Sequence, residues 1–298
     1  MRIAVTGVTS FIGKAFVNSA LNKGWDILAV VRKASPELIN LQNNNDLQVL
    51  ELSMEDYLHF SSRAGKIDCL VHFAWNGTRG SFRADEELQK SNYENSVNLI
   101  NAAIENGCKK ILTAGSQAEY GLCNGLITEE TICNPNTAYG YYKNKLYETT
   151  KIICSKSDVS YKEPRIFSVY GSGDYEKTLI MTLIQNMSNN QECKITDCIQ
   201  MWDYLYIKDA VSAMIGLCEK DCSDGAYNLG SGDVRCLRDY VEELKLITHS
   251  SSKILYGAVP YPDSGMVSIY PSIKKIKSEI KWKPKYTFEQ GIKEMILL

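Results

Sequence analysis

Short apolar runs alternate with segments of helical apolar spacing along the first part of the chain. Strand-like runs occur at residues 2–6, 27–31, 47–52, 68–74 and 110–114, with a sixth at 164–171. The run at 68–74 is almost entirely apolar, which is typical of a strand buried on both faces. Helical spacing separates the runs, as in the segment from Tyr139 to about Ser155. This alternation predicts an α/β fold with a parallel sheet.

The alternation loosens beyond Gly171, where short strands and helices follow one another less regularly. Further helices are expected at 179–187, 209–218, 237–248 and from about 272, and the last one opens with a capping box at Thr287–Gln290. We expect a nucleotide-binding domain over 1–165, with a return segment at about 203–230. A smaller, partly interleaved C-terminal lobe over 166–202 and 231–298 would bind the substrate.

Composition and charge exclude several classes of protein. The 298 residues are 44% hydrophobic and 23% charged, which supports a substantial core. A formal net charge of -2 without a basic stripe argues against nucleic-acid binding. No apolar stretch reaches the roughly 20 residues of a membrane span, and Met1 leads directly into a strand-like run. We therefore expect a cytoplasmic protein without a signal peptide.

The cysteines and histidines do not form a metal-binding pattern. Ten cysteines are scattered without a Cys-x-x-Cys pair, and there are three histidines. The cysteines are expected to be reduced thiols, and no metal site is predicted. His72 lies in the middle of a strand and is interpreted as a core histidine.

A glycine turn follows the first strand and leads into a helix. Gly7 permits the tight turn, and Gly13 allows the helix to pack close to the strand, while Ser10 replaces the usual middle glycine. The pyrophosphate of a dinucleotide would lie at this helix N-terminus, beside Ser10, Phe11 and Ile12. The sheet is therefore predicted to be doubly wound and of the Rossmann type.

The end of the second strand indicates which dinucleotide would bind. NAD sites usually have an acidic residue there for the ribose 2′-hydroxyl, whereas a cation accommodates a 2′-phosphate. Arg32 and Lys33 occupy this turn, so we expect NADP(H). Ser53 and Met54 would lie near the adenine, and Phe73 and Ala74 are expected to contact the cofactor.

A tyrosine and a lysine four residues apart, Tyr139 and Lys143, would lie on one face of a helix. A neighbouring ammonium favours the phenolate, so the pKa of Tyr139 is expected to fall. Tyr141 and Lys145 have the same spacing and are an alternative pair. Ser116 follows the fifth strand, at the sheet edge where open parallel sheets bind their ligands. A serine, a tyrosine and a lysine on such a fold can act as a proton relay for carbonyl and alcohol chemistry.

The chain resembles the nucleotide-sugar branch of the extended short-chain dehydrogenase/reductase family, over essentially its whole length. The motifs that carry the resemblance are Thr6-Gly7 with Ser10-Phe11-Ile12-Gly13, Val71-His72-Phe73-Ala74, Gly115-Ser116, Ala138-Tyr139-Gly140 with Lys143, the segment 165–171, Trp202-Asp203-Tyr204 and Trp282-Lys283-Pro284.

The resemblance implies a role for each member of the relay. Tyr139 would be the acid/base, Lys143 would hold the nicotinamide ribose, Ser116 would bind the reacting oxygen and Asn92 would support the proton relay. The Ala-Tyr-Gly flank favours Tyr139 and Lys143 over the alternative pair. A homodimer through the helices around Asn92 and Tyr139 is also implied.

The reaction is narrowed by what the chain lacks. Dehydratases of this family carry an Asp-Glu pair after the active-site Ser/Thr, where this chain has Gln117 and Ala118. The Cys/His pair of the bifunctional epimerase-reductases is not found beside Ser116. A 4-ketoreductase or a 4-epimerase remains, and Arg32-Lys33 favours a reductase that turns over NADPH. The end of the chain is similar to the deoxysugar reductases that make CDP-abequose and related sugars.

The expected reaction is NADPH-dependent reduction of the C4 carbonyl of a nucleotide-linked 4-keto-6-deoxyhexose. The substrate would be linked to dTDP, CDP, GDP or UDP. Three alternatives stay open: a 4-epimerase that retains NAD, a reductase of small non-nucleotide carbonyls, and a catalytically silent NADP-binding protein.

Substrate contacts are expected from positions near the presumed pocket. Relatives often have Asn at the position of Ser168 and Arg at the position of Trp202 to hold the nucleotide-sugar. Gln200 and Trp202 could instead bond to and stack on the substrate here. Trp75, Gln117 and Glu119 are expected to face the pocket.

Overall fold

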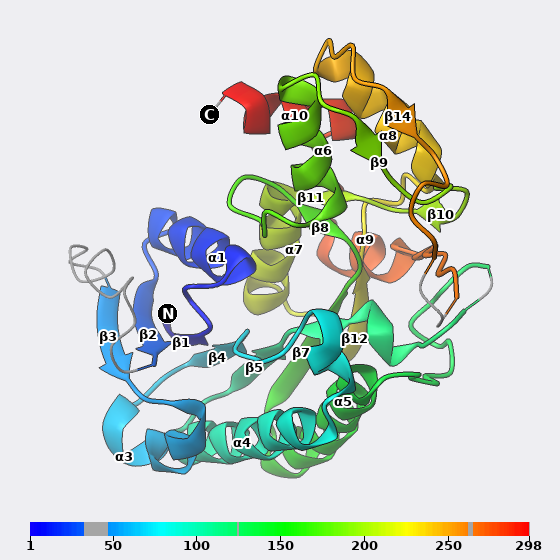
Figure 1. Cartoon of the computed structure of the whole chain (residues 1–298). Helices are drawn as coiled ribbons and strands as arrows, with labels where there is room; N and C mark the ends of the chain where they lie inside the picture. Colours follow the sequence, from blue (N-terminus) through cyan, green and yellow to red (C-terminus); the bar gives the residue numbers. More distant parts are fainter. Residues whose placement is uncertain (33–46, 124, 262–264, 298) are drawn as a thin grey trace.

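A parallel sheet forms the core of the first lobe. The computed structural model describes residues 1–32, 47–123, 125–261 and 265–297, and the strand order in this part is β3-β2-β1-β4-β5-β7-β12, with β6 beside β7 (Figure 1). The strand bounds are β1 Arg2–Thr6, β2 Asp26–Val31, β3 Leu47–Glu51, β4 Cys69–His72, β5 Lys110–Thr113, β6 Gly115–Ser116, β7 Ser160–Ile166 and β12 Gly225–Leu229. All the pairings are parallel, as the alternating pattern predicts.

The strand order runs in opposite directions on the two sides of β1. This strand pairs with β2 on one side and with β4 on the other, so the loops that follow β1 and β4 part at the carboxyl edge. Such a reversal opens the crevice in which doubly wound sheets bind ligands. Residues Gly7 and Phe73 begin these two loops.

Helices cover both faces of the sheet. Their bounds in this lobe are α1 Phe11–Asn22, α3 Phe60–Ala64, α4 Glu86–Glu105, α5 Ala138–Ser157 and α7 Ile207–Glu219. Helix α1 contacts α7, whereas α4 contacts α5 and α3 (Figure 1). Two apolar clusters lie on either side of the sheet, one containing Ile3 and Val5, and the other containing Ala4 and Leu70.

The sixth strand differs from its predicted position. We expected it at 164–171, but β7 spans Ser160–Ile166 and β8 spans Val169–Tyr170. The first half of β7 contains Lys162 and Glu163, which are nevertheless buried. Lys162 forms an ion pair with Asp224 at 3.1 Å, and Arg165 forms one with Glu163 at 3.2 Å. Because these buried polar side chains have partners on other side chains, the strand can contain them, and apolar periodicity does not reveal it.

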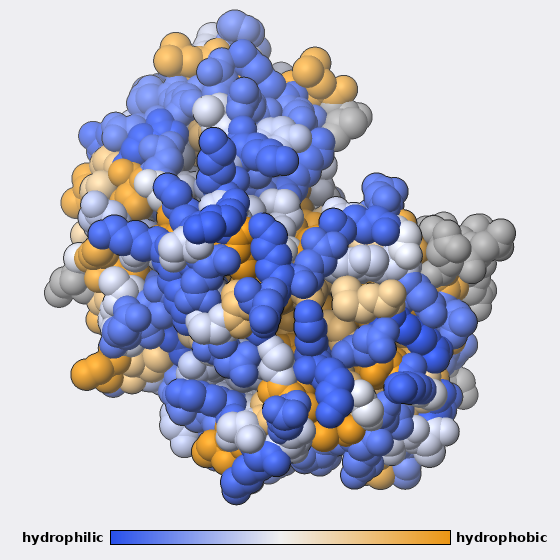
Figure 2. Space-filling model, turned by 180° about the vertical axis from the view of Figure 1, so that it is seen from behind, coloured by the Kyte–Doolittle hydropathy of each residue, from blue (hydrophilic) through white to orange (hydrophobic). Residues whose placement is uncertain are grey.

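The second lobe consists of helices and short strand pairs. Its helices are α6 Leu179–Ser188, α8 Leu237–Ile247, α9 Lys274–Ile280 and α10 Phe288–Leu297, and its strand pairs are β8 with β11 Leu205–Tyr206, β9 Cys193–Lys194 with β14 Ile254–Leu255, and β10 Met201–Trp202 with β13 Arg235–Cys236. The chain returns to the first lobe through α7 and β12. Hydrophilic residues cover most of the rear face of the molecule (Figure 2).

The predicted capping box at the start of α10 is confirmed. Thr287 N–H donates to Gln290 Oε1 at 2.9 Å, and Gln290 N–H donates to Thr287 Oγ1 at 3.2 Å. The ring of Phe288 then lies 5.2 Å from that of Tyr170. The helix start is thereby fixed against β8.

Candidate active site

The loop after β1 lies against the loop after β4. Gly7 has φ +67°, and a Cβ there would lie 2.7 Å from the backbone nitrogen of Ala74. A Cβ on Gly13 would lie 2.1 Å from the carbonyl oxygen of Gly7. Ser10 caps α1 by accepting Gly13 N–H at 3.1 Å. Both glycines are therefore required for the close approach of backbone segments that a pyrophosphate site needs.

A cavity of about 290 Å³ lies between these loops and the end of β2. The residues predicted to bind cofactor that line it are Gly7, Ser10, Arg32, Met54, Phe73 and Ala74. Ser53 is not in its lining, and its hydroxyl instead donates to Asp56 at 2.7 Å. Lys33 lies outside the described residues. A tight glycine turn and a helix N-terminus fit a nicotinamide dinucleotide, and Arg32 adds a cation at the end of β2.

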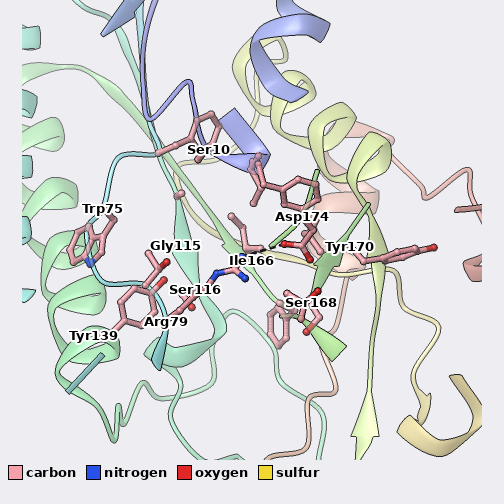
Figure 3. Close-up of a pocket in the computed structure, with 18 of the residues that line it drawn as sticks. Ser10, Trp75, Arg79, Gly115, Ser116, Tyr139, Ile166, Ser168, Tyr170 and Asp174 are labelled. Atoms are coloured by element: carbon pink, nitrogen blue, oxygen red, sulfur yellow. Dashed lines mark hydrogen bonds and ion pairs between the residues drawn. The ribbon is translucent and has the colours of Figure 1, made fainter. Parts of the chain in front are cut away.

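A larger cavity of about 570 Å³, called the main cavity below, lies between the two lobes (Figure 3). The predicted site residues that line it are Ser10, Phe11, Ile12, Phe73, Trp75, Ser116, Tyr139, Lys143, Ser168 and Trp202. Ser10, Phe73 and Trp75 also line the smaller cavity, so the two spaces are neighbours. Tyr139 and Ser116 lie together on one wall (Figure 3).

Helix α5 carries Tyr139 and Lys143 into the cavity. Thr137 caps the helix by accepting Gly140 N–H at 3.1 Å. Tyr139 is 8% exposed and Lys143 is 5% exposed. Tyr141 and Lys145, the alternative pair, are exposed and line neither cavity among the described residues.

The environment of Lys143 holds its ammonium close to the cavity wall. Its Nζ donates to the carbonyl oxygen of Ala114 at 2.8 Å and lies 3.8 Å from the centre of the Trp75 ring. Burial lowers the pKa of Lys143 from its ordinary value of 10.5 to about 8, and the charges of Glu119 and Glu163 oppose this effect. The ammonium is therefore the main form at neutral pH.

The expectation of a lowered tyrosine pKa is corrected by the structure. Burial raises the pKa of Tyr139, and a hydrogen bond with Ser116 and the charge of Arg83 offset only part of that effect. Lys143 points to Ala114 and Trp75, so its charge does not dominate the phenol. A protonated phenol beside a serine hydroxyl is arranged to donate a proton.

Asn92 lies behind the cavity wall. Its Oδ1 accepts Asn76 N–H at 3.0 Å, and its Nδ2 donates to the Asn76 carbonyl at 2.8 Å. Asn92 is 2% exposed and thus fixes the loop after β4 from inside. Asn76 itself lines the smaller cavity.

Three residues expected to face the substrate do not line the main cavity. The Glu119 side chain is fully buried, with one oxygen on Ser116 N–H and the other on Arg165. Gln200 is buried, and its Oε1 accepts the hydroxyl of Tyr261 at 2.9 Å. Gln117 is partly exposed but is in neither lining. The expectation failed for Glu119 because an ion-pair partner far along the chain, Arg165, turns its side chain inward.

Sequence reasoning missed two arginines in the cavity. Arg79 Nη2 lies 3.2 Å from Asp174 Oδ1, and the guanidinium of Arg83 lies 4.5 Å from the centre of the Tyr139 ring. Both belong to the segment after β4, in or beside the short 3-10 helix Gly80–Ala84. The available signal was two arginines four residues apart in a loop at the carboxyl edge of the sheet.

His72 and the cysteines have the environments that the sequence predicts. His72 is 2% exposed and its ring nitrogens bond to Thr6 and Ser96, which confirms the core interpretation. All ten cysteines are free thiols. Among the described residues, no group of three or more His, Cys, Asp or Glu side chains could hold a metal ion. In the same part of the chain, no helix is long and apolar enough to cross a membrane.

Comparisons with known proteins agree with this architecture. The sequence pattern of the NAD dependent epimerase/dehydratase family matches residues 3–230. CDP-abequose synthase of Salmonella muenchen is 27% identical, over 99% of this chain and 97% of the relative. The dTDP-4-dehydro-6-deoxyglucose reductase of Escherichia coli is 24% identical, over 99% and 96%.

Solved structures share the fold. UDP-glucose 4-epimerase of Thermotoga maritima, solved with UDP-glucose, superposes with a TM-score of 0.89 at 24% identity and covers 100% of this chain and 98% of its own. WbmG of Bordetella bronchiseptica, solved with NAD, gives a TM-score of 0.84 at 22% identity and covers 100% and 93%. The predicted α/β fold with a doubly wound sheet is thereby confirmed.

Proposed function

The chain belongs to the NAD-dependent epimerase/dehydratase family and is an enzyme, and from this premise we propose that it is a reductase. It uses NADPH to reduce the C4 carbonyl of a nucleotide-linked 4-keto-6-deoxyhexose. One observation carries the proposal: Tyr139, Ser116 and Lys143 line a large cavity directly beside a smaller one that fits a dinucleotide.

The cofactor and the protein each supply part of the proposed reaction. When bound, the nicotinamide supplies the hydride that forms the new C–H bond at C4. The Ser116 hydroxyl donates a hydrogen bond to the carbonyl oxygen and stabilises the negative charge that develops there. Tyr139 transfers its phenolic proton to that oxygen, and the carbonyl becomes a hydroxyl. The Lys143 ammonium holds the nicotinamide ribose, and the Ser116 hydroxyl and the charge of Arg83 stabilise the resulting phenolate.

The protonation of Tyr139 favours this direction. Burial raises its pKa, so the phenol carries the proton that a reduction consumes. Oxidation of an alcohol, which an epimerase needs in its first half-reaction, requires the phenolate instead.

A dissociable NADP(H) is part of the proposal. Arg32 is exposed at the end of β2 and lines the smaller cavity. Its guanidinium suits a 2′-phosphate, with which it can form charge-assisted hydrogen bonds. A net reductase must exchange its cofactor after each turnover, whereas a 4-epimerase recycles a bound NAD.

A nucleotide-sugar is supported by the relatives and by the cavity. Two relatives are named for a CDP-sugar and for a dTDP-4-dehydro sugar. Arg79 and Arg83 add positive charge to the main cavity, which suits the diphosphate of such a substrate. Trp75, Ser168 and Trp202 would contact the sugar and the nucleotide. In this proposal residues 166–202 and 231–298 hold the nucleotide-sugar, and residues 1–165 with 203–230 hold the cofactor.

A dehydratase is not supported. The positions that would carry its Asp-Glu pair are Gln117 and Ala118. Glu119, the next residue, is buried on Arg165 and cannot reach the cavity without breaking that ion pair.

The expected homodimer also remains a proposal. Tyr141 and Ile152 of α5 are 49% and 54% exposed, and apolar exposure of this kind suits a helix that meets a second copy. Light scattering at the mass of a monomer would contradict it.

The direct test is an assay with dTDP-, CDP-, GDP- and UDP-linked 4-keto-6-deoxyhexoses, in which NADPH absorbance is followed. We expect stoichiometric NADPH oxidation with one of them, abolished in Tyr139→Phe and retained in Tyr141→Phe. If no substrate oxidises NADPH while NAD co-purifies and a 4-hydroxy sugar nucleotide is interconverted, the protein is an epimerase.

A further inference from the structure

Two carboxyl groups and one guanidinium are buried directly behind Ser116. Glu119, Glu163 and Arg165 are 0%, 1% and 2% exposed. Arg165 Nε donates to Glu119 Oε2 at 2.9 Å and to Glu163 Oε1 at 3.2 Å. A buried charge without compensation is strongly unfavourable, so the three side chains form one electrostatic unit.

The charges of Arg165 and, more weakly, of Lys143 offset only part of what raises the pKa of Glu163. Burial and the neighbouring Glu119 raise the pKa of Glu163 well above its ordinary value. The neutral member is therefore Glu163, whose Oε2 also accepts the Tyr161 hydroxyl at 3.2 Å. Glu119 makes the shorter of the two contacts with Arg165, at 2.9 Å compared with 3.2 Å for Glu163.

Glu119 connects this unit to the active-site serine. Its Oε1 accepts Ser116 N–H at 2.6 Å, while the Ser116 Oγ accepts Ala118 N–H at 3.2 Å. Because Ala118 occupies the acceptor side of the Ser116 hydroxyl, its O–H remains free to donate. Gly115 leaves room for the arrangement, since a Cβ there would lie 2.7 Å from Glu163 Cγ and 3.0 Å from Glu119 Oε1.

We propose that Glu119 is a positioning residue for the reduction. Its carboxylate, held by Arg165, fixes the backbone of Ser116 so that the serine hydroxyl donates to the reacting oxygen. Glu119 lines neither cavity and acts only through Ser116. The catalytic consequence rests on the proposed function, whereas the positioning itself does not.

The test compares Glu119→Gln and Glu119→Ala with the matched variant Glu129→Gln. Glu129 also accepts a backbone N–H, from Asn228 at 2.8 Å, but lies outside both cavities. Amide hydrogen exchange of residues 115–121 reports the positioning, and kcat and KM report the consequence. NADPH affinity and the melting temperature identify variants that fail to fold.

We expect Glu119→Ala to speed the exchange of the Ser116 amide and to lower kcat by about 100-fold, with KM for NADPH unchanged. Glu119→Gln keeps an oxygen for Ser116 but turns an amide N–H towards Arg165, so kcat falls by about tenfold. Glu129→Gln should leave both the exchange and kcat as in the wild type.

Unchanged exchange of the Ser116 amide in a folded Glu119→Ala variant would overturn the proposal. So would faster exchange with an unchanged kcat. A wild-type protein without reductase activity, whose Ser116 amide still depends on Glu119, would instead refute the proposed function and leave the positioning role intact.

Discussion

The guanidinium of Arg79 lies 3.2 Å from the carboxylate of Asp174 and joins the two lobes across the main cavity (Figure 3). Arg79 follows β4 in the first lobe, whereas Asp174 follows β8 beside the second. Asp174 is 9% exposed and also accepts Tyr175 N–H at 2.7 Å. A diphosphate entering the cavity would compete with this carboxylate for Arg79.

Arg79→Gln and Arg83→Gln should each weaken binding of CDP, UDP or dTDP by about tenfold, because each removes one charge that would face the diphosphate of the proposed substrate. Isothermal titration with the nucleoside diphosphate that binds best measures this without any reaction. Arg63→Gln, which removes an exposed charge on α3, is the control. Asp174→Asn keeps an oxygen for Arg79 and removes the competing charge, so tighter binding is expected. Equal affinities in all four variants would contradict the role of the arginines.

The activity should fall as the pH rises through about 8, where buried Lys143 loses its proton. In the proposed reaction the ammonium holds the ribose, so kcat/KM is expected to fall about tenfold per pH unit above that value. The pH profile of kcat/KM measures it. Lys145→Gln, which changes the exposed neighbour, should keep the same profile. A rate that rises across this range would indicate a phenolate mechanism instead.

Arg32→Ala should raise KM for NADPH by about tenfold and leave KM for NADH nearly unchanged, since only NADPH carries the 2′-phosphate. The ratio of kcat/KM for the two cofactors gives the result directly. Arg63→Ala is the charge-matched control. An equal fall in kcat/KM for NADPH and for NADH would show that Arg32 does not bind the 2′-phosphate.

The contribution of Glu163 to the stability of the wild type should fall as the pH rises above the ordinary carboxyl pKa of 4.5, because Glu163 holds its proton in the folded state and loses it on unfolding. The slope approaches about 1.4 kcal/mol per pH unit over the window between the two pKa values. Glu163→Gln removes this slope. Urea unfolding at a series of pH values measures the free energy, and parallel curves would mean that Glu163 is ionised in the folded state.

The apolar pattern predicted the first lobe well because parallel strands buried on both faces have few polar residues. The strand at 68–74 follows this rule, since β4 lies within it and is buried throughout. Gly7 and Gly13 lie where a Cβ would meet backbone atoms. The same rule failed for β7, where Lys162 and Glu163 are buried with partners that lie elsewhere in the chain.

The candidate site likewise contains residues that local motifs predict and residues whose roles depend on distant partners. Local motifs predicted Tyr139, Lys143, Ser116 and the glycine turn as candidates, and the structure brings them together at the two cavities. The roles of Glu119, Arg79 and Asp174 depend on pairings across 46 and 95 residues, which a single sequence does not reveal. The pKa of Tyr139 likewise depends on its burial and not on its spacing from Lys143.

The central claim is that a hydride passes from NADPH to C4 in a net reduction, and isotope transfer tests it most directly. NADPH deuterated at the transferred position would be incubated with the 4-keto substrate, and the product analysed by NMR. We predict one deuterium at C4 for each NADP⁺ released, none at other carbons, and no transfer in Tyr139→Phe. A product without deuterium, formed with no net oxidation of NADPH, would contradict the account.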